Sequence, residues 1–348
     1  MSVSQKEKMF FAEHLSLLLR GGVSLNEALN ILTIEAKSKA FKKALSDVLR
    51  QVLEGRTFHD SLKKYPQIFD NFFQNVIQIG EESGTLEENL KYLSLYIRSE
   101  YLLRKKVTGS LIYPLIIIVM ALFIVITVSF FILPRLVGLF RALGITLPLA
   151  TRILLATGGF LNKYGLLILI GAVVLFAIFR ILNSIKIFRF YFHKISLYLP
   201  FFGIINKNRN LTVFSRTLYT LLKSGVPILD SLNVCIDTIS NEVFKKDMSL
   251  VKSAVERGEK ISQGLKRYPE VFPSIFSNMV LVGEKTGALE ESLLHLVDFY
   301  DTEVDTALKN LTGIMEPLVL ILVGLFVAFV ALAIITPIYQ FSSGLRTR

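Results

Sequence analysis

Cysteine and histidine are scarce in this sequence of 348 residues. The single cysteine, Cys235, excludes an intrachain disulfide and fits soluble parts that lie in a reducing compartment. The four histidines share no spacing typical of metal ligands. No histidine or nucleophile stands at a spacing that would complete a catalytic group with a carboxylate. We therefore expect no metal, no cofactor and no catalytic site.

Strand-like alternation of apolar and polar residues is also missing. No stretch shows it between turn-forming residues, so no β-sheet is expected. Apolar residues recur instead at helical spacing, as in residues 4–20 and 86–97. Ser24 and Thr85 each precede a glutamate by three residues, the capping-box pattern that begins a helix. The sequence therefore predicts an all-α fold.

Charged residues are absent from three long apolar runs, residues 111–133, 164–179 and 317–338. With 52% apolar residues and a mean hydropathy of +0.53, the chain is too hydrophobic for an ordinary soluble protein. A bilayer core about 30 Å thick requires roughly 20 helical residues, which the first and third runs provide. The middle run is shorter and crosses if Lys163 and Arg180 at its ends extend to the headgroups. We expect three transmembrane helices and a polytopic membrane protein.

One segment of the chain occurs twice, at a constant offset of 203 residues. The common frame runs from about residue 11 to 134 and from 214 to 337. It contains the motifs Tyr-Pro-x-hydrophobic-Phe and Gly-Glu-x-Ser/Thr-Gly-x-Leu-Glu-Glu. The matched positions are Gly22 and Gly225, Tyr65-Pro66 and Tyr268-Pro269, Gly80-Glu81 and Gly283-Glu284, and Gly84 and Gly287. Two copies make an internal duplication and not a solenoid, so we expect two homologous helical bundles of about six helices each.

The three runs and the two bundles give an expected order along the chain. The middle run has no repeat partner, and the extra crossing that it adds places both bundles on one side of the membrane. The distribution of Lys and Arg favours the cytoplasmic side for the bundles. The expected parts are a first cytoplasmic bundle at 1–110, a transmembrane helix at 111–134, an extracytoplasmic loop at 135–163, a second transmembrane helix at 164–182, a cytoplasmic linker at 183–210, the second cytoplasmic bundle at 211–313, a third transmembrane helix at 314–338 and a short extracytoplasmic tail at 339–348.

The formal net charge of +11 has a membrane interpretation. The basic residues of the soluble parts are interspersed with nearly as many acids, unlike the basic groove of a nucleic-acid-binding protein. We attribute the charge to membrane orientation and to contact with anionic lipid. No nucleic acid is expected as a partner.

The Gly-Glu motif does not form a phosphate-binding loop. Glu284 separates Gly283 from Lys285, whereas a P-loop has glycine, lysine and a hydroxyl residue in succession. In the first copy the lysine position is Glu82, which would repel phosphate. The motif instead predicts a turn between two helices. The acid pairs that follow it, at 87–88 and 290–291, complement a helix dipole or form an acidic docking patch for a partner.

Glu316 lies at the mouth of the third apolar run, directly before Pro317. It is either an interfacial acid among the headgroups or an ionisable group at membrane depth, which is functional by default. In the second case it would receive a cationic group from another membrane-embedded partner. Pro114 is the first-copy equivalent of Pro317, and these prolines mark either a helix boundary or a shared kink. We single out Glu316, Pro317 and Pro114 as candidate membrane partner contacts.

The ordered motifs resemble a known family over nearly the whole chain. Residues 18–25 and 221–228, the two motifs above and Met315-Glu316-Pro317 are similar to the F-domain proteins of type II secretion and type IV pilus machines. These include the GspF and PilC families and their competence relatives. The resemblance implies a non-enzymatic, homo-oligomeric assembly platform of the cell inner membrane. Its implied partners are a cytoplasmic hexameric ATPase, a pilin or pseudopilin lifted out of the membrane, and other inner-membrane assembly proteins.

Two other classes of protein remain open at this point. A small transporter built from repeats is the alternative, although such proteins usually carry polar sites in broken helices at the bilayer midplane. The three apolar runs here are nearly free of ionisable residues. A membrane-bound enzyme has no active-site group to support it.

Overall fold

A computed structural model describes residues 3–110, 112–127, 149–182, 185–200 and 202–345, and every regular element in these ranges is an α-helix. The all-α prediction is confirmed for them. The first copy contains α1 (Gln5–Arg20), α2 (Leu25–Glu35), α3 (Lys39–Leu53), α4 (Phe58–Leu62), α5 (Asn71–Ser83) and α6 (Leu86–Ser110). The second contains α11 (Phe202–Lys223), α12 (Ile228–Thr238), α13 (Glu242–Glu256), α14 (Ile261–Lys266), α15 (Ser274–Thr286) and α16 (Leu289–Leu345). Between them lie α7 (Ile112–Thr127), α9 (Leu149–Leu182) and α10 (Lys186–Tyr198).

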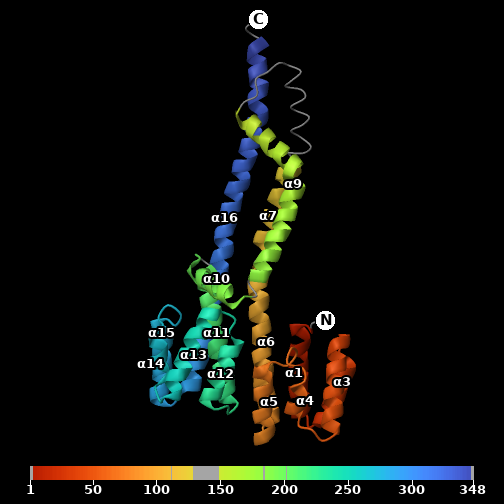
Figure 1. The fold of residues 1–348 in the computed structure, drawn as a ribbon, viewed down its shortest axis with the longest axis vertical. Coiled ribbons are helices and arrows are strands. Elements are labelled where there is room, and N and C mark those ends of the chain that lie inside the picture. The colour runs from red at the N-terminus through yellow and green to blue at the C-terminus, as the bar shows by residue number, and fades with distance from the viewer. Residues whose placement is uncertain (1–2, 111, 128–148, 183–184, 201, 346–348) are drawn as a thin grey trace. The chain divides into compact units, whose positions relative to one another are not determined.

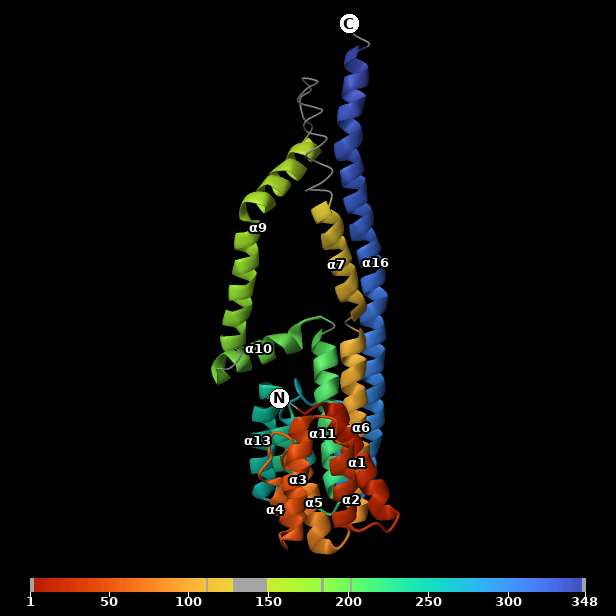
Figure 2. The same cartoon turned by 90° about the vertical axis from the view of Figure 1, so that its right-hand side faces the viewer.

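The chain divides into two compact units, and each is described by itself. The bundle unit comprises Met1–Val107 and Phe190–Ala307, and the span unit comprises Thr108–Arg189 and Leu308–Arg348. Helices α1–α5 and α11–α15, together with the first parts of α6 and α16, therefore belong to one unit. Within it, the first-copy bundle and the second-copy bundle lie side by side (Figures 1 and 2).

The duplication is visible in the backbone of the bundle unit. Three glycines in each copy end a helix with a positive φ, a backbone angle that other residues rarely adopt. They lie at equivalent positions in the two copies. The pairs are Gly22 (78°) and Gly225 (83°), Gly55 (88°) and Gly258 (88°), and Gly84 (71°) and Gly287 (73°). Each copy thus has the same helix ends at the same offset.

Four phenylalanines at equivalent positions form the centre of each bundle. In the first copy they are Phe11, Phe41, Phe69 and Phe73, and in the second they are Phe214, Phe244, Phe272 and Phe276. All eight side chains are at most 4% exposed. Their ring centroids lie 5.0–6.3 Å apart in the pairs that touch, within the range of favourable aromatic contacts. The two copies therefore fold around the same aromatic core.

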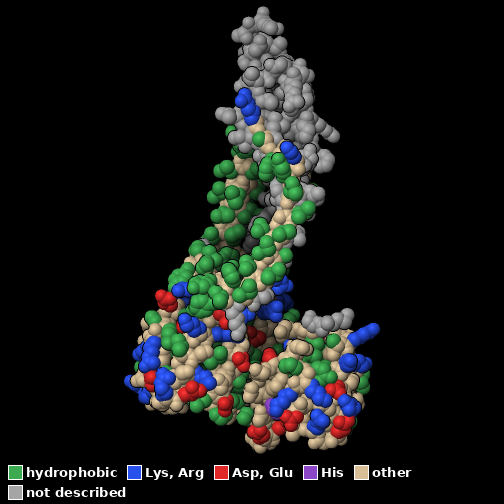
Figure 3. Space-filling view, in the orientation of Figure 1, with side chains coloured by type: hydrophobic (Ala, Val, Ile, Leu, Met, Phe, Trp, Pro, Cys, Tyr) green, Lys and Arg blue, Asp and Glu red, His purple; other side chains and the backbone are tan. Residues whose placement is uncertain are grey.

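The span unit is apolar on its surface. Large apolar side chains are exposed along α7, α9 and α16, as at Leu115 (61%), Leu175 (68%) and Leu325 (68%) (Figure 3). A soluble protein rarely exposes so continuous an apolar surface. By length and composition, residues Leu289–Phe329 form the one helix among the described residues that is able to cross a membrane.

Two boundaries in this unit differ from those expected. α9 begins at Leu149, inside the expected loop 135–163, because residues 149–163 are also apolar enough to continue the helix. α16 runs without interruption through Pro317 to Leu345, so the helix does not end at that proline. Residues 128–148, with Pro134 and the end of the expected first span, lie outside the described residues.

Candidate functional site

The Tyr-Pro motif makes the same turn in both copies. The Tyr65 carbonyl accepts hydrogen bonds from the amides of Ile68 and Phe69, each at 2.9 Å. The Tyr268 carbonyl accepts from Val271 at 3.1 Å and from Phe272 at 2.8 Å. Pro66 and Pro269 begin the turn with a fixed φ. The turn directs the last residue of the motif, Phe69 or Phe272, into the aromatic core.

The glutamate of the Gly-Glu motif caps a short helix elsewhere in its own bundle. The Glu81 carboxylate accepts from the amides of Phe58 at 2.6 Å and His59 at 2.7 Å, in the first turn of α4. Glu284 accepts from Ile261 at 2.6 Å and Ser262 at 3.1 Å, in the first turn of α14. Amides in a first turn have no partner within the helix, and a negative charge is favourable there.

The glycine of the same motif permits a close helix approach. A Cβ on Gly80 would lie 2.9 Å from Cα of Leu86, and one on Gly283 would lie 2.9 Å from Cα of Leu289. Any side chain there would push apart α5 and α6, or α15 and α16. With Gly84 and Gly287 forming the turn, the whole motif builds a helical hairpin.

Three acids after the turn, Glu87, Glu88 and Glu290, have partners inside their own bundle. The Glu87 carboxylate lies 3.8 Å from Nε of Arg20, and the Glu290 carboxylate lies 3.6 Å from Nζ of Lys223. These two ion pairs occupy equivalent positions in the two copies. Tyr92 donates a hydrogen bond to Glu88, which raises the pKa of Tyr92 to about 12. Helix capping and these pairs account for the matched acids within the bundles, and the docking-patch interpretation stays a prediction.

A buried ion network joins the two bundles and was not anticipated from the sequence. The guanidinium of Arg216 in α11 is 3.2 Å from Glu100 of α6 and 3.1 Å from Asp301 of α16. Its side chain is 8% exposed. Burial raises the pKa of the Glu100 carboxyl, and the charge of Arg216 opposes that rise.

Other polar contacts connect the same surfaces. Thr217 donates to the Tyr96 hydroxyl at 3.3 Å, and Asn71 donates to Asp237 at 2.9 Å. Burial raises the pKa of the Tyr96 hydroxyl.

A charge pair that is reversed between the two copies could have indicated part of this network from the sequence. Position 216 corresponds to Glu13 and position 301 to Arg98, so the two copies carry the pair with reversed charge. In the first copy Arg98 and Glu13 also pair, at 3.2 Å, but both side chains are at least 40% exposed. A reversed pair at fixed positions indicates spatial contact.

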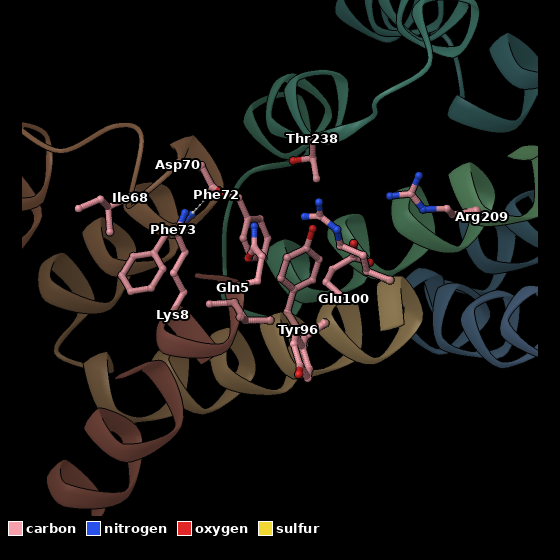
Figure 4. A pocket seen from close by; sticks show the side chains of 13 residues that line it. Gln5, Lys8, Ile68, Asp70, Phe72, Phe73, Tyr96, Glu100, Arg209 and Thr238 are labelled. Atoms are coloured by element: carbon pink, nitrogen blue, oxygen red, sulfur yellow. Dashed lines mark hydrogen bonds between the residues drawn. The ribbon is translucent and has the colours of Figure 1, made fainter. Parts of the chain in front are cut away.

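A cavity of about 240 Å³ lies beside this network, between the bundles (Figure 4). Basic side chains from both copies and acidic side chains from the first copy share its wall. Those labelled in the figure include Lys8, Asp70, Tyr96, Glu100, Arg209 and Thr238. The pKa of Lys8 is lowered by burial and raised in part by Asp70. Because the wall carries both signs of charge, it does not select one class of ion.

The three candidate membrane contacts belong to the span unit and not to the bundle unit. Pro114 lies in α7, and Glu316 and Pro317 lie in α16. The side chains of Glu316 and Pro114 are outside the described residues. The roles proposed for these three residues stay predictions.

The chain is thus a duplicated all-helical protein in which each copy is a helical bundle followed by an apolar segment. Residues 11–134 and 214–337 each match the family described as type II secretion system (T2SS), protein F. The chain belongs to this family, and the resemblance inferred from its motifs is confirmed. The two matched ranges coincide with the two copies of the repeat.

Relatives with names from two machines cover most of the chain. A type IV pilus assembly protein PilC of Thermus thermophilus is 33% identical over 96% of this chain and 82% of its own length. A type II secretion system protein F of Vibrio cholerae is 29% identical over 98% of this chain and 84% of its own. A PilC of Pseudomonas aeruginosa is 29% identical, over 95% and 88%.

Proposed function

We propose that this chain is an inner-membrane assembly platform of a type IV pilus or type II secretion machine. In this proposal it couples a cytoplasmic ATPase to the polymerisation of pilin or pseudopilin. The observation that carries the proposal is the double match to the protein F family across both copies. Because similar relatives are named for both machines, the proposal covers both.

The proposed division of labour follows from the two units. The bundle unit carries mixed charges and offers surface for the ATPase. The span unit is apolar and offers its helices to the pilin or pseudopilin and to other inner-membrane proteins. This requires three crossings, at 111–134, 164–182 and 314–338, with both bundles in the cytoplasm.

Thiol labelling tests the topology. In a Cys235→Ser background, we would place single cysteines at Leu53 and Leu250, which are 64% and 46% exposed, and at Thr146 in the expected loop. A membrane-impermeant maleimide is then added to intact spheroplasts. We expect Thr146→Cys to react at once, and the two bundle thiols to react only after lysis. Opposite labelling of Leu53→Cys and Leu250→Cys would place the copies on opposite sides, contradict the platform and favour an inverted-repeat transporter.

Glu316→Gln tests the proposed membrane contact. An ionisable group within the apolar part of α16 is costly unless a partner or water compensates it. We expect this isosteric change to remove most filament assembly or secretion while protein level and membrane insertion stay at wild-type values. The matched control is Asp298→Asn, an exposed acid of the same helix outside the candidate sites, which should retain activity. Wild-type activity of Glu316→Gln would end the idea.

A further inference from the structure

The two bundles touch through different faces. The first-copy bundle contributes an α5/α6 face, which includes Asn71, Phe72, Ile79, Tyr96 and Glu100. The second-copy bundle contributes an α11/α12 face, which includes Arg216, Thr217, Thr220, Ser224 and Asp237. The contacts between the two faces include the Asn71–Asp237 and Thr217–Tyr96 hydrogen bonds and the Arg216–Glu100 ion pair. A contact between unlike faces is heterologous. Unlike a two-fold contact, in which each partner uses the same surface, it leaves one face of each kind without a partner.

Each face exists twice because the chain is duplicated. The contact within the chain uses the α5/α6 face of the first copy and the α11/α12 face of the second. It leaves their equivalents unused: an α1/α2 face on the first copy and an α15/α16 face on the second. The contact that joins the bundles within one chain can therefore be made again at each of these two faces.

The unused α1/α2 face is more apolar than the covered face to which it corresponds. Ile34, which is 67% exposed, occupies the position of Asp237. Leu17, which is 65% exposed, occupies the position of Thr220, whose exposure is 4%. Exposed apolar side chains replace polar ones, although no residue that the structure describes covers them. Grouped exposed apolar residues of this kind mark interaction surfaces.

The unused α15/α16 face keeps apolar residues where the used face has them. Phe299 (43% exposed) corresponds to Tyr96 (7%), and Ile275 (51%) corresponds to Phe72 (3%). Val282, 53% exposed, corresponds to Ile79, whose side chain lies near Gly225 of the other bundle. Tyr96 and Phe72 are buried and Ile79 is partly buried, whereas their equivalents in the second copy are exposed.

The two unused faces together carry the same kinds of charge as the covered network. The covered network has one arginine and two acids, with Glu100 supplied by the α5/α6 face. Glu303 occupies the position of Glu100 on the unused α15/α16 face. The unused α1/α2 side carries the Arg98–Glu13 pair at the positions of Asp301 and Arg216. Docking of these faces would again place one arginine with two acids.

We propose that the α1/α2 face of one chain binds the α15/α16 face of a second copy of this chain and repeats the contact that joins the bundles within the chain. A heterologous contact of this kind builds a ring if its rotation closes and an open array if it does not. The inference rests on the assembly platform proposed above and names an interface between its subunits.

Cysteine pairing between full-length chains tests the interface. Ile34 and Ser274 occupy the positions of Asp237 and Asn71, whose side chains are 2.9 Å apart within the chain. We would co-express two differently tagged Cys235→Ser chains, one with Ile34→Cys and the other with Ser274→Cys, and oxidise the membranes. We expect a covalent dimer that carries both tags. Both substituted side chains are exposed, so the fold should be retained.

The matched control uses Leu53→Cys in place of Ile34→Cys. Leu53 is 64% exposed on α3 of the same bundle and lies outside the α1/α2 face. It should give no dimer with Ser274→Cys. Equal yields from the two pairs would show random collision and overturn the proposal. So would the absence of a dimer when both thiols react with a maleimide, or pairing of Ile34→Cys with a different protein only.

A charge placed on the face provides a second readout. Leu17 and Val282 lie in the same proposed interface as Ile34. Ile34→Glu should therefore remove the cross-link between a Leu17→Cys chain and a Val282→Cys chain. Leu53→Glu should leave that cross-link unchanged. If the predicted pairs fail but the thiol-labelling topology is as expected, this interface is wrong and the platform function stands. If the labelling itself fails, the platform proposal falls whatever the cross-links show.

Discussion

Arg216→Ala is expected to lower the free energy of unfolding of the bundle unit by about 3–5 kcal/mol, the usual cost of removing one partner from a buried ion pair. The guanidinium is 8% exposed and lies between Glu100 and Asp301. Its loss leaves two carboxylates near each other at the contact between the bundles. Urea titration of the purified full-length protein, read by pulse proteolysis, measures the change.

The first copy supplies the control for this prediction. Arg98 makes the reversed pair with Glu13, but its side chain is 57% exposed. Exposed pairs contribute about 0–1 kcal/mol, so Arg98→Ala should change the free energy of unfolding little. Equal losses for the two variants would contradict a special role for the buried network.

The Arg216→Ala deficit should also depend on pH. Burial already raises the pKa of Glu100 above its ordinary value of 4.5 in the folded protein. A carboxyl with a raised folded pKa favours folding below its unfolded pKa and loses that contribution as pH rises through the folded pKa. Without Arg216 the pKa of Glu100 rises further. The difference from wild type should therefore shrink when the titration is repeated at mildly acidic pH.

Phe272→Ala is expected to lower the free energy of unfolding by about 3–5 kcal/mol, the range for truncating a buried phenylalanine. Its side chain is 1% exposed and contacts Phe214, Phe244 and Phe276. The cavity would lie where α11, α13 and α15 meet. The same urea titration detects it as a lower midpoint.

Phe69, the equivalent residue of the first copy, and the exposed Phe10 serve as comparisons for this prediction. Phe69→Ala in the first copy removes the same contacts with Phe11, Phe41 and Phe73 and should cost a similar amount. Phe10→Ala removes a side chain that is 43% exposed and should cost much less. A loss at Phe272 no larger than that at Phe10 would show that the Tyr-Pro motif does not anchor the core.

Local features of this fold could be predicted because they depend on nearby residues. Ser24 caps α2 by accepting from the Glu27 amide at 3.3 Å, as its spacing predicts. Gly22 and Gly84 end helices with a positive φ. Glu81 matches Glu284 across the copies, but its partners in α4 lie more than 20 residues away in sequence. Sequence spacing alone does not identify such a cap.

By itself, the sequence determined that the chain is all-α, apolar in long runs and duplicated, because helical periodicity and a constant offset are both properties of residue order. Only the tertiary structure decided which copy of each face is covered. The copies share their motifs and their aromatic cores, so each bundle viewed alone gives no reason for Tyr96 to be buried and Phe299 to be exposed. That difference comes from the neighbouring bundle, which covers one α5/α6-type face and leaves the other in solvent.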